Sequence, residues 1–148
     1  MSVDERGMKK PAGQSLHFRG RKLGRRLKTE LEGIIAVIEK LKHEADEDTV
    51  ILVEGQRDKQ ALQQLGITGR ILSLREFRNE VRVYLNAERV ILLLDFDEEG
   101  VEMYKRVRTR LEQQGFKVEP FYYRRLCEMR RFGVYTVEEM GRYLNRVL

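Results

Sequence analysis

Residues 90–100 of the chain read VILLLDFDEEG. The first five, Val90–Leu94, are apolar at every position, which is typical of a strand that is covered on both faces of a parallel sheet. Asp95 and Asp97 follow the strand directly. Because side chains two residues apart in an extended segment project to the same side, the segment predicts an acidic pair at the end of a buried strand.

A second strand ending of the same kind lies earlier in the chain. Val50–Val53 is an apolar run rich in β-branched residues, which indicates a buried strand, and it leads directly into Glu54 and Gly55. Because ligands of parallel α/β sheets bind outside the carboxyl ends of the strands, Glu54 faces Asp95 and Asp97 if the two strands are neighbours. A glycine at position 55 fits a tight turn that lets the backbone approach a phosphate.

Three carboxylates at one strand edge repel one another strongly unless a cation lies between them. Oxygen ligands favour a hard divalent ion, and Mg²⁺ typically takes one or two protein carboxylates together with waters and substrate phosphate. We therefore predict a site for Mg²⁺, with Mn²⁺ as a substitute, at Glu54, Asp95 and Asp97. The helix expected to start near Gly100 would also offer free N–H groups to an anion.

The rest of the middle of the chain alternates between short apolar strands and amphipathic helices. The predicted strands are Val50–Val53, Arg70–Leu74, Val90–Leu94 and Phe116–Tyr122, and the predicted helices are Asp58–Leu65, Glu76–Asn86 and Glu99–Gln114. This order predicts an α/β fold with a four-stranded parallel sheet that is flanked by helices.

Helical segments are also predicted on both sides of this region. Apolar residues repeat at helical spacing between Leu27 and Leu41, which predicts an amphipathic helix that packs on the domain or binds a second copy of the chain or another protein. Thr136 and Glu139 fit a capping box for a last helix. We therefore divide the chain into a basic arm with a helix (1–48), an α/β domain (49–123) and a helical extension (124–148).

The formal net charge of +5 comes from the beginning of the chain. Nine basic residues and no acidic residue lie between Arg6 and Thr29. Such an arm, expected to be flexible before about Arg21, would bind phosphate backbones through counterion release, whereas the plainer interpretation is a solvated tail. The candidate contacts to nucleic acid in the arm are Arg19, Arg21, Lys22, Arg25 and Arg26.

Composition excludes several other classes of protein. The longest apolar run, Val90–Leu94, is far shorter than the roughly 20 residues of a membrane-spanning helix. Residues 1–10 are polar, so we expect no secretory signal. The single cysteine, Cys127, excludes an internal disulfide framework, and we expect a reduced, cytoplasmic setting.

Two motifs in the chain resemble the signature motifs of the Toprim domain. They are VEGQRD at residues 53–58 and DFDEEG at residues 95–100, and the resemblance covers about residues 49–123. The Toprim domain is shared by bacterial-type primases, type IA and type II topoisomerases, OLD-family nucleases and the 5S ribosomal RNA maturase. The chain is most similar to the small stand-alone Toprim proteins and more distantly to the maturase and the primases. The resemblance implies a four-stranded parallel sheet between helices and a function with Mg²⁺ and nucleic acid.

The resemblance also implies individual functions for the motif residues. Glu54 matches a glutamate that serves as metal ligand or general acid/base, and Asp95 and Asp97 match the aspartates that hold Mg²⁺. Gly55, Asp58 and Gly100 match framework positions, at which Asp58 orders the loop. Small Toprim proteins often have lysine where this chain has Gln56, so the cation that faces the phosphate would come from Arg57, Lys59 or the basic arm.

We therefore expect a Mg²⁺-dependent nuclease that cleaves phosphodiester bonds of RNA or DNA, with Glu54, Asp95 and Asp97 as its catalytic residues. The alternative is a non-catalytic module that binds metal and nucleic acid within a replication, repair or RNA-processing complex. A third class is a small-molecule phosphatase, because LLLDFD also resembles the aspartyl-phosphate loop of haloacid-dehalogenase-like enzymes. Against it, Glu99 stands where those enzymes usually have threonine or valine.

Overall fold

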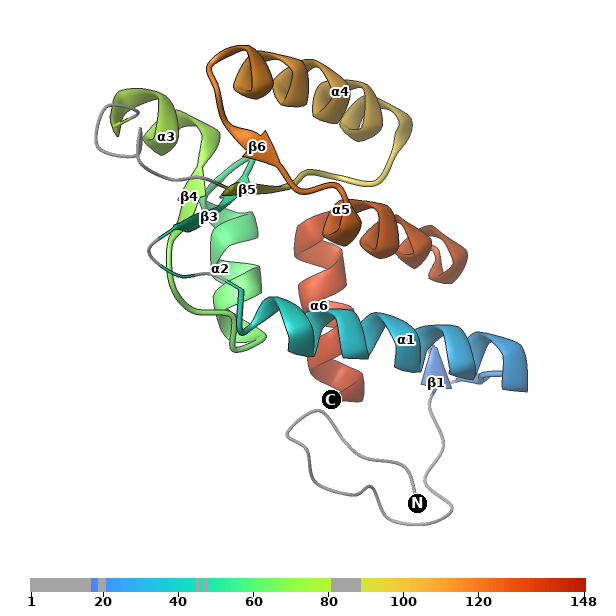
Figure 1. The fold of residues 1–148 in the computed structure, drawn as a ribbon. Helices are drawn as coiled ribbons and strands as arrows, with labels where there is room; N and C mark the ends of the chain where they lie inside the picture. Colours follow the sequence, from blue (N-terminus) through green and yellow to red (C-terminus); the bar gives the residue numbers. More distant parts are fainter. Residues whose placement is uncertain (1–16, 19–20, 45, 47, 81–88) are drawn as a thin grey trace.

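The computed structural model describes residues 17–18, 21–44, 46, 48–80 and 89–148 of the chain (Figure 1). The elements in chain order are β1 (His17–Phe18), β2 (Arg21–Lys22), α1 (Arg25–Leu41), β3 (Thr49–Val53), α2 (Gln56–Gln64), β4 (Ile71–Ser73), α3 (Leu74–Glu80), β5 (Arg89–Leu93), α4 (Glu98–Gln113), β6 (Lys117–Val118), α5 (Phe121–Leu126), the 3₁₀ helix η1 (Cys127–Phe132) and α6 (Val137–Val147).

The central sheet has four parallel strands in the order β4-β3-β5-β6, as the sequence predicts. Strands β3 and β5 are neighbours, and their register places Val53 opposite Leu93. From β3 the chain moves outward to β4 and then returns past β3 to β5, so the direction of winding reverses between β3 and β5. In open α/β sheets this reversal is where ligands bind.

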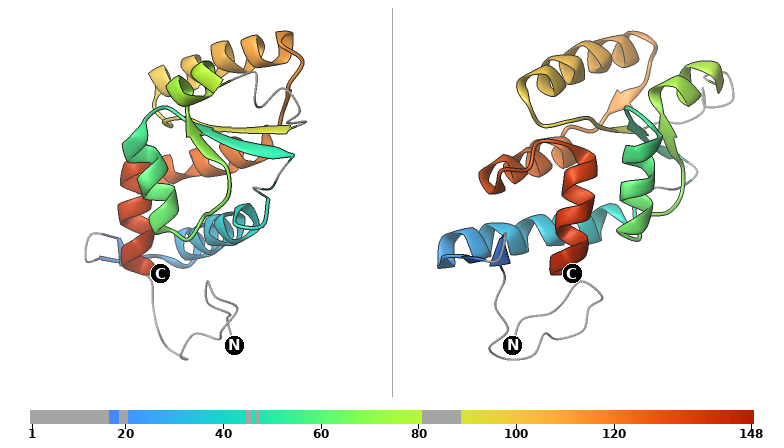
Figure 2. Two further views of the ribbon diagram at one scale, coloured as in Figure 1. Left: turned by 90° about the vertical axis from the view of Figure 1, so that its left-hand side faces the viewer. Right: turned by 180° about the vertical axis from the view of Figure 1, so that it is seen from behind.

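Helices cover the sheet on both faces (Figures 1 and 2). Helices α3 and α4 lie on one face, and α2, α5 and α6 lie on the other, where α1 packs on the side of α5 away from the sheet. Both faces of the inner strands are therefore removed from water. This explains why every residue of β3 is buried and why Val90–Leu93 of β5 have no exposed surface.

One hydrophobic core joins the central sheet to the flanking helices. The apolar residues of α1 show how the sequence pattern is used, since Leu31, Ile34, Ile38 and Leu41 are fully buried in this core. This apolar face of α1, for which binding to a second copy or another protein was the alternative, is therefore covered by the chain itself. Burial of such a face supplies most of the stability of a helix in a protein.

The fourth strand is shorter than the sequence analysis predicts. Instead of Phe116–Tyr122, only Lys117–Val118 pair with β5, and Phe121 begins the helix α5. Pro120 explains the early end, because proline has no N–H to continue a strand ladder and tolerates the start of a helix. Tyr122 and Tyr123 therefore lie in α5, where both are buried, and do not extend the sheet.

Two other predicted segments lie partly outside the described residues. Of the arm expected to be flexible before Arg21, residues 1–16 and 19–20 are not described, and Phe18 lies opposite Arg21 in a short antiparallel pairing. The helix predicted for Glu76–Asn86 begins earlier, as α3 at Leu74, and residues 81–86 of that prediction lie outside the described residues. In the described part of the chain, no helix is both long and apolar enough to cross a membrane.

Helices α2 and α6 approach each other closely at Gly141. A Cβ atom at position 141 would lie 2.8 Å from the Cβ of Ala61, which is closer than two such carbons can pack. The absence of a side chain at Gly141 therefore sets the spacing between the two helices on this face of the sheet.

Replacement of Gly141 with leucine should lower the free energy of unfolding by about 1–3 kcal/mol, because overpacking forces the two helices apart. Urea denaturation measures the change. The matched control is Asn145→Leu, an exposed position of the same helix, for which we expect a change within about 0.5 kcal/mol. An equal effect of the two substitutions would contradict the close packing of α2 and α6.

Candidate functional site

The topology of the sheet brings the predicted carboxylates to one edge. Because β3 and β5 are parallel neighbours, the residues that follow Val53 and Leu93 leave the sheet side by side. Glu54 is the first residue after β3, and Asp95 is the second after β5. Both stand at the reversal of winding, which is the expected position of a ligand site in this class of sheet.

Asp95 is held in place by segments that come from the end of the chain. Its Oδ1 atom accepts a hydrogen bond from the backbone N–H of Val137 (3.1 Å). Its backbone oxygen accepts a hydrogen bond from the hydroxyl of Tyr123 (2.6 Å). The next residue, Phe96, is fully buried and donates its N–H to the carbonyl of Tyr135 (2.7 Å). The position of Asp95 therefore depends on α5 and on the start of α6.

Asp97 is the N-cap of α4. Its Oδ1 atom accepts a hydrogen bond from the backbone N–H of Gly100 (2.7 Å). This corrects the expectation that the N–H groups near Gly100 are free for an anion, since the carboxylate of Asp97 already uses one of them. Gly100 itself packs so closely that a Cβ atom there would collide with the backbone carbonyl of Asp95. Glycine at position 100 thus lets the turn after β5 close.

On the neighbouring strand, Glu54 is exposed, and the chain turns at Gly55 into α2. The carboxylate of Asp58 accepts a hydrogen bond from the N–H of Gly55 (3.1 Å). Asp58 is therefore engaged in ordering the turn that carries Glu54, while Glu54 accepts no hydrogen bond from any described residue.

Two of the predicted site carboxylates, Glu54 and Asp95, have pKa values that neighbouring negative charges help to raise. Although Glu54 is exposed, its partial loss of contact with water raises its pKa above the ordinary value, and the negative charges of Asp95 and Asp97 raise it further. The pKa of Asp95 is also raised, first by burial and then by Asp97, against the opposing effect of the Val137 N–H. Mutual repulsion of this kind is what a cation between carboxylates relieves.

Two residues at this edge were missed as site residues by the sequence analysis. Glu138 and Glu139, in the first turn of α6, both contribute to raising the pKa of Asp95. The sequence predicted only the capping function of Glu139, and the hydroxyl of Thr136 indeed accepts a hydrogen bond from its N–H (3.0 Å). Nothing local to Thr136–Glu139 indicates that α6 begins beside Asp95, because that placement depends on long-range packing.

The oxygen atoms at this edge can be compared with the ligands that a divalent ion requires. In the part of the chain that the structure describes, no group of three or more His, Cys, Asp or Glu side chains is arranged to hold a metal ion by itself. Asp95 and Asp97 each use one oxygen for a backbone N–H, and the second oxygen of each accepts no hydrogen bond from a described residue. Two such oxygens fit Mg²⁺, which completes its shell with waters and substrate phosphate.

The predicted cations near the first motif have different environments. The ammonium of Lys59 pairs with the carboxylate of Glu76 (3.5 Å), which also accepts a hydrogen bond from the side chain of Gln56 (2.8 Å). Arg57 is exposed and has no ion-pair partner among the described residues. Of the two basic side chains predicted to face a phosphate from α2, Arg57 is therefore the available one.

The part of the basic arm that the structure describes does not reach the carboxylates. Arg25 is exposed, and Arg26 pairs with Glu30 at 3.6 Å in the first turns of α1, which begins away from the sheet (Figure 1). Arg21 and Lys22 form β2, and Arg19 lies outside the described residues. Contact of the arm with nucleic acid stays a prediction.

A comparison with protein families matches residues 48–122 to the Toprim domain. Two curated relatives are similar over most of their length. A UPF0292 protein of Methanocaldococcus jannaschii is 31% identical over 125 residues, which cover 79% of this chain and 94% of the relative. A UPF0292 protein of Pyrococcus abyssi is 31% identical over 114 residues, which cover 76% of this chain and 84% of the relative.

A solved structure is similar to the fold. It is described as a putative protein from Aquifex aeolicus, and it aligns with a TM-score of 0.57 and 30% sequence identity. The alignment covers 70% of this chain and 94% of the other. The similarity therefore extends over nearly the whole of that protein.

The electrostatics of Asp58 predict how stability depends on pH. Burial raises its pKa from 3.8 to about 6, opposed by the Gly55 N–H and reinforced by Asp95 and Glu54. Because the folded state holds this proton more tightly than the unfolded state, ionisation of Asp58 makes unfolding easier as the pH rises from about 4 to 6.

The substitution Asp58→Asn should remove this loss of stability and keep an oxygen that accepts the Gly55 N–H. We expect the variant to gain stability relative to the wild type as the pH rises through that window. Urea denaturation at pH 4, 5, 6 and 7 measures the difference. Asp48→Asn, at an exposed position, serves as the control. Parallel pH profiles of the wild type and Asp58→Asn would refute the prediction.

Proposed function

The chain belongs to the Toprim family, and from this premise we propose that it is a Mg²⁺-dependent enzyme that cleaves phosphodiester bonds of RNA or DNA. A Toprim domain indicates a function that involves a metal ion and nucleic acid. The observation that supports the finer proposal is that Glu54 and Asp95 follow two neighbouring parallel strands, where the charges of Asp95 and Asp97 help to raise the pKa of Glu54. Carboxylates held together against their own repulsion are costly to the fold, which is expected of a functional site.

In the proposed mechanism, Asp95 and Asp97 are the metal ligands. The free oxygens of Asp95 and Asp97 would hold Mg²⁺, while the Val137 and Gly100 N–H groups fix the orientation of the two carboxylates. Held there, the ion would supply polarisation of the scissile phosphate and stabilisation of charge on the attacking and leaving oxygens.

Glu54 acts as the general base in this proposal. Its carboxylate accepts the proton of the attacking water or hydroxyl group, and its raised pKa makes it a better proton acceptor than an ordinary glutamate. The absence of a hydrogen-bond donor to Glu54 among the described residues leaves the carboxylate available for this transfer.

A second candidate function is a non-catalytic module that binds metal and nucleic acid within a larger replication, repair or RNA-processing complex. One observation favours it. Half of the oxygen atoms of Asp95 and Asp97 are engaged by the protein's own backbone, and no complete metal cluster exists within the described residues. A metal site of that kind can hold an ion together with a phosphate and perform no cleavage.

Cleavage of end-labelled RNA and DNA, single and double stranded, tests the enzyme directly. The wild type should cleave in Mg²⁺ or Mn²⁺ and not in EDTA, and Asp95→Asn and Asp97→Asn should abolish cleavage by removing metal ligands. Glu54→Gln should lower the rate by about 10²–10⁴-fold, as expected for loss of a general base, and retain metal binding.

The control for these variants is Asp48→Asn, which should cleave like the wild type. Cleavage retained by Asp95→Asn would reject the site. No cleavage of any substrate by the wild type, together with nucleic-acid binding that survives Asp95→Asn, would favour the binding module over the enzyme.

A further inference from the structure

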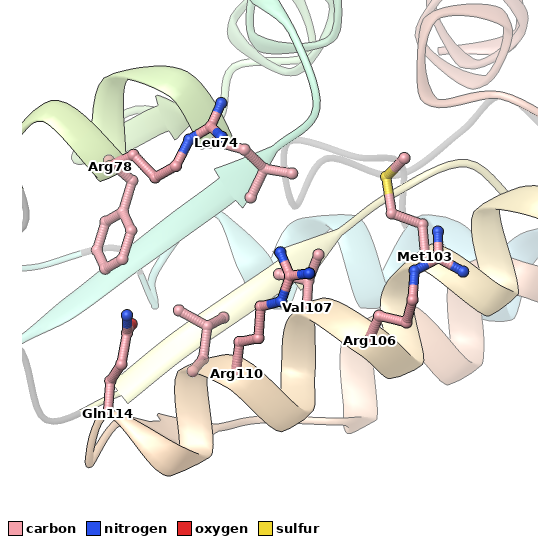
Figure 3. Close-up of a pocket in the computed structure, with 9 residues that line it drawn as sticks. Leu74, Arg78, Met103, Arg106, Val107, Arg110 and Gln114 are labelled. Atoms are coloured by element: carbon pink, nitrogen blue, oxygen red, sulfur yellow. The ribbon is translucent and has the colours of Figure 1, made fainter.

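Helices α3 and α4 are separated by a groove with a volume of about 580 Å³ (Figure 3). This volume is typical of ligand sites. The floor is apolar, with Phe77 and Leu111 almost fully buried and Leu74, Met103 and Val107 partly exposed. The described residues that line the groove include none from the basic arm and none of Glu54, Asp95 and Asp97.

The groove begins at the edge of the sheet that carries the carboxylates. Leu74 directly follows β4, and Met103 lies in the second turn of α4, which Asp97 caps. Helix α3 packs over β3 and β4, whereas α4 packs over β5 and β6. The gap between the helices therefore lies over the boundary between β3 and β5, the two strands that lead to Glu54 and Asp95.

Three arginines line the groove. Arg78 comes from α3, and Arg106 and Arg110 come from α4 on the other side (Figure 3). None of the three has an ion-pair partner among the described residues. The described lining contains no acidic side chain, whereas Glu98, Glu99 and Glu102 line an adjoining hollow that shares Met103 and Arg106. Unpaired guanidinium groups beside an apolar surface fit an anion, and phosphate above all, because arginine can bind it in a bidentate manner.

The spacing of the arginines favours a polymer over an isolated anion. Arg106 and Arg110 are four residues apart on one helix, which separates them by about 6 Å along its axis. This distance is similar to that between successive phosphates of an extended strand. From Met103 to Gln114 the lining follows α4 for about 16 Å, so the groove has room for more than one nucleotide.

We propose that the groove between α3 and α4 binds a single strand of RNA or DNA that extends from the carboxylate edge. Phosphates contact Arg78, Arg106 and Arg110, and bases or sugars lie against the apolar floor formed by Leu74, Met103 and Val107. A basic groove with an apolar platform is the general solution for binding single strands without sequence preference. The inference rests on the proposed function, because it names the path of that function's substrate.

Binding of labelled single-stranded oligonucleotides, measured by fluorescence anisotropy in EDTA over a range of salt concentrations, tests the groove without metal or cleavage. The test variant is Arg106→Gln/Arg110→Gln, at two exposed positions. The matched control is Arg142→Gln/Arg146→Gln, which removes the same charge from exposed positions of α6, also four residues apart and on the other face of the sheet.

The groove variant should bind more weakly than the wild type, and its slope of log affinity against log salt should be less steep by about 1.4. Each phosphate contact to a single strand contributes about 0.7 to that slope. The control variant should bind like the wild type. Equal losses of affinity in the two variants would mean that binding depends on the overall charge of the protein and not on the groove, which would overturn the inference. Unchanged binding by the groove variant would also overturn it and would point to another occupant, such as an acidic helix of a protein.

The same samples separate this inference from the proposed function. Binding of the oligonucleotide in EDTA reports on the groove alone, because the groove needs no metal ion, whereas cleavage in Mg²⁺ reports on the proposed enzyme. Cleavage by the wild type with unchanged binding by Arg106→Gln/Arg110→Gln would overturn the groove alone. No cleavage with weakened binding by that variant would support the groove and count against the enzyme. A wild type that binds no nucleic acid would overturn both.

Discussion

Repulsion among carboxylates at one edge of the sheet is the constraint on which the rest of the site depends. It follows from the parallel pairing of β3 with β5, which forces Glu54 and Asp95 to leave the sheet together. The protein offsets part of the repulsion with backbone donors, since the N–H groups of Val137 and Gly100 each bind one carboxylate. The pKa values of Glu54 and Asp95 are raised first by burial and then by neighbouring carboxylates, and a divalent cation is the natural group to relieve the repulsion.

The end of the chain is part of this arrangement. Tyr123 and Val137 hold the backbone and the side chain of Asp95 from α5 and from the start of α6. The ring of Tyr123 stacks on Tyr104 of α4, with ring centres 4.0 Å apart, so α5 and α4 are fixed to each other near the same turn. The segments that follow the strands therefore support the geometry of the site, and Gly141 sets how closely α6 can approach α2.

The features encoded locally could be predicted from the sequence, and those set by long-range packing could not. Uninterrupted apolar runs and strand-end acids predicted the parallel sheet and the edge at which Glu54 and Asp95 meet, because both depend on strand periodicity and chain direction. The end of β6 was misjudged because Pro120 outweighs the apolar residues that follow it. The proximity of α6 to Asp95 and the groove between α3 and α4 had no local signal, because each combines residues from elements distant in the sequence.

Thermal unfolding with and without metal shows whether the strand-end carboxylates form a divalent-metal site. Mg²⁺ or Mn²⁺ should raise the Tm of the wild type, by an amount equivalent to about 2.7 kcal/mol when the ion is present at 100 times its Kd. The variant Asp95→Asn/Asp97→Asn should show no rise. An unchanged Tm of the wild type in saturating metal, or an equal rise in the double variant, would contradict the metal site.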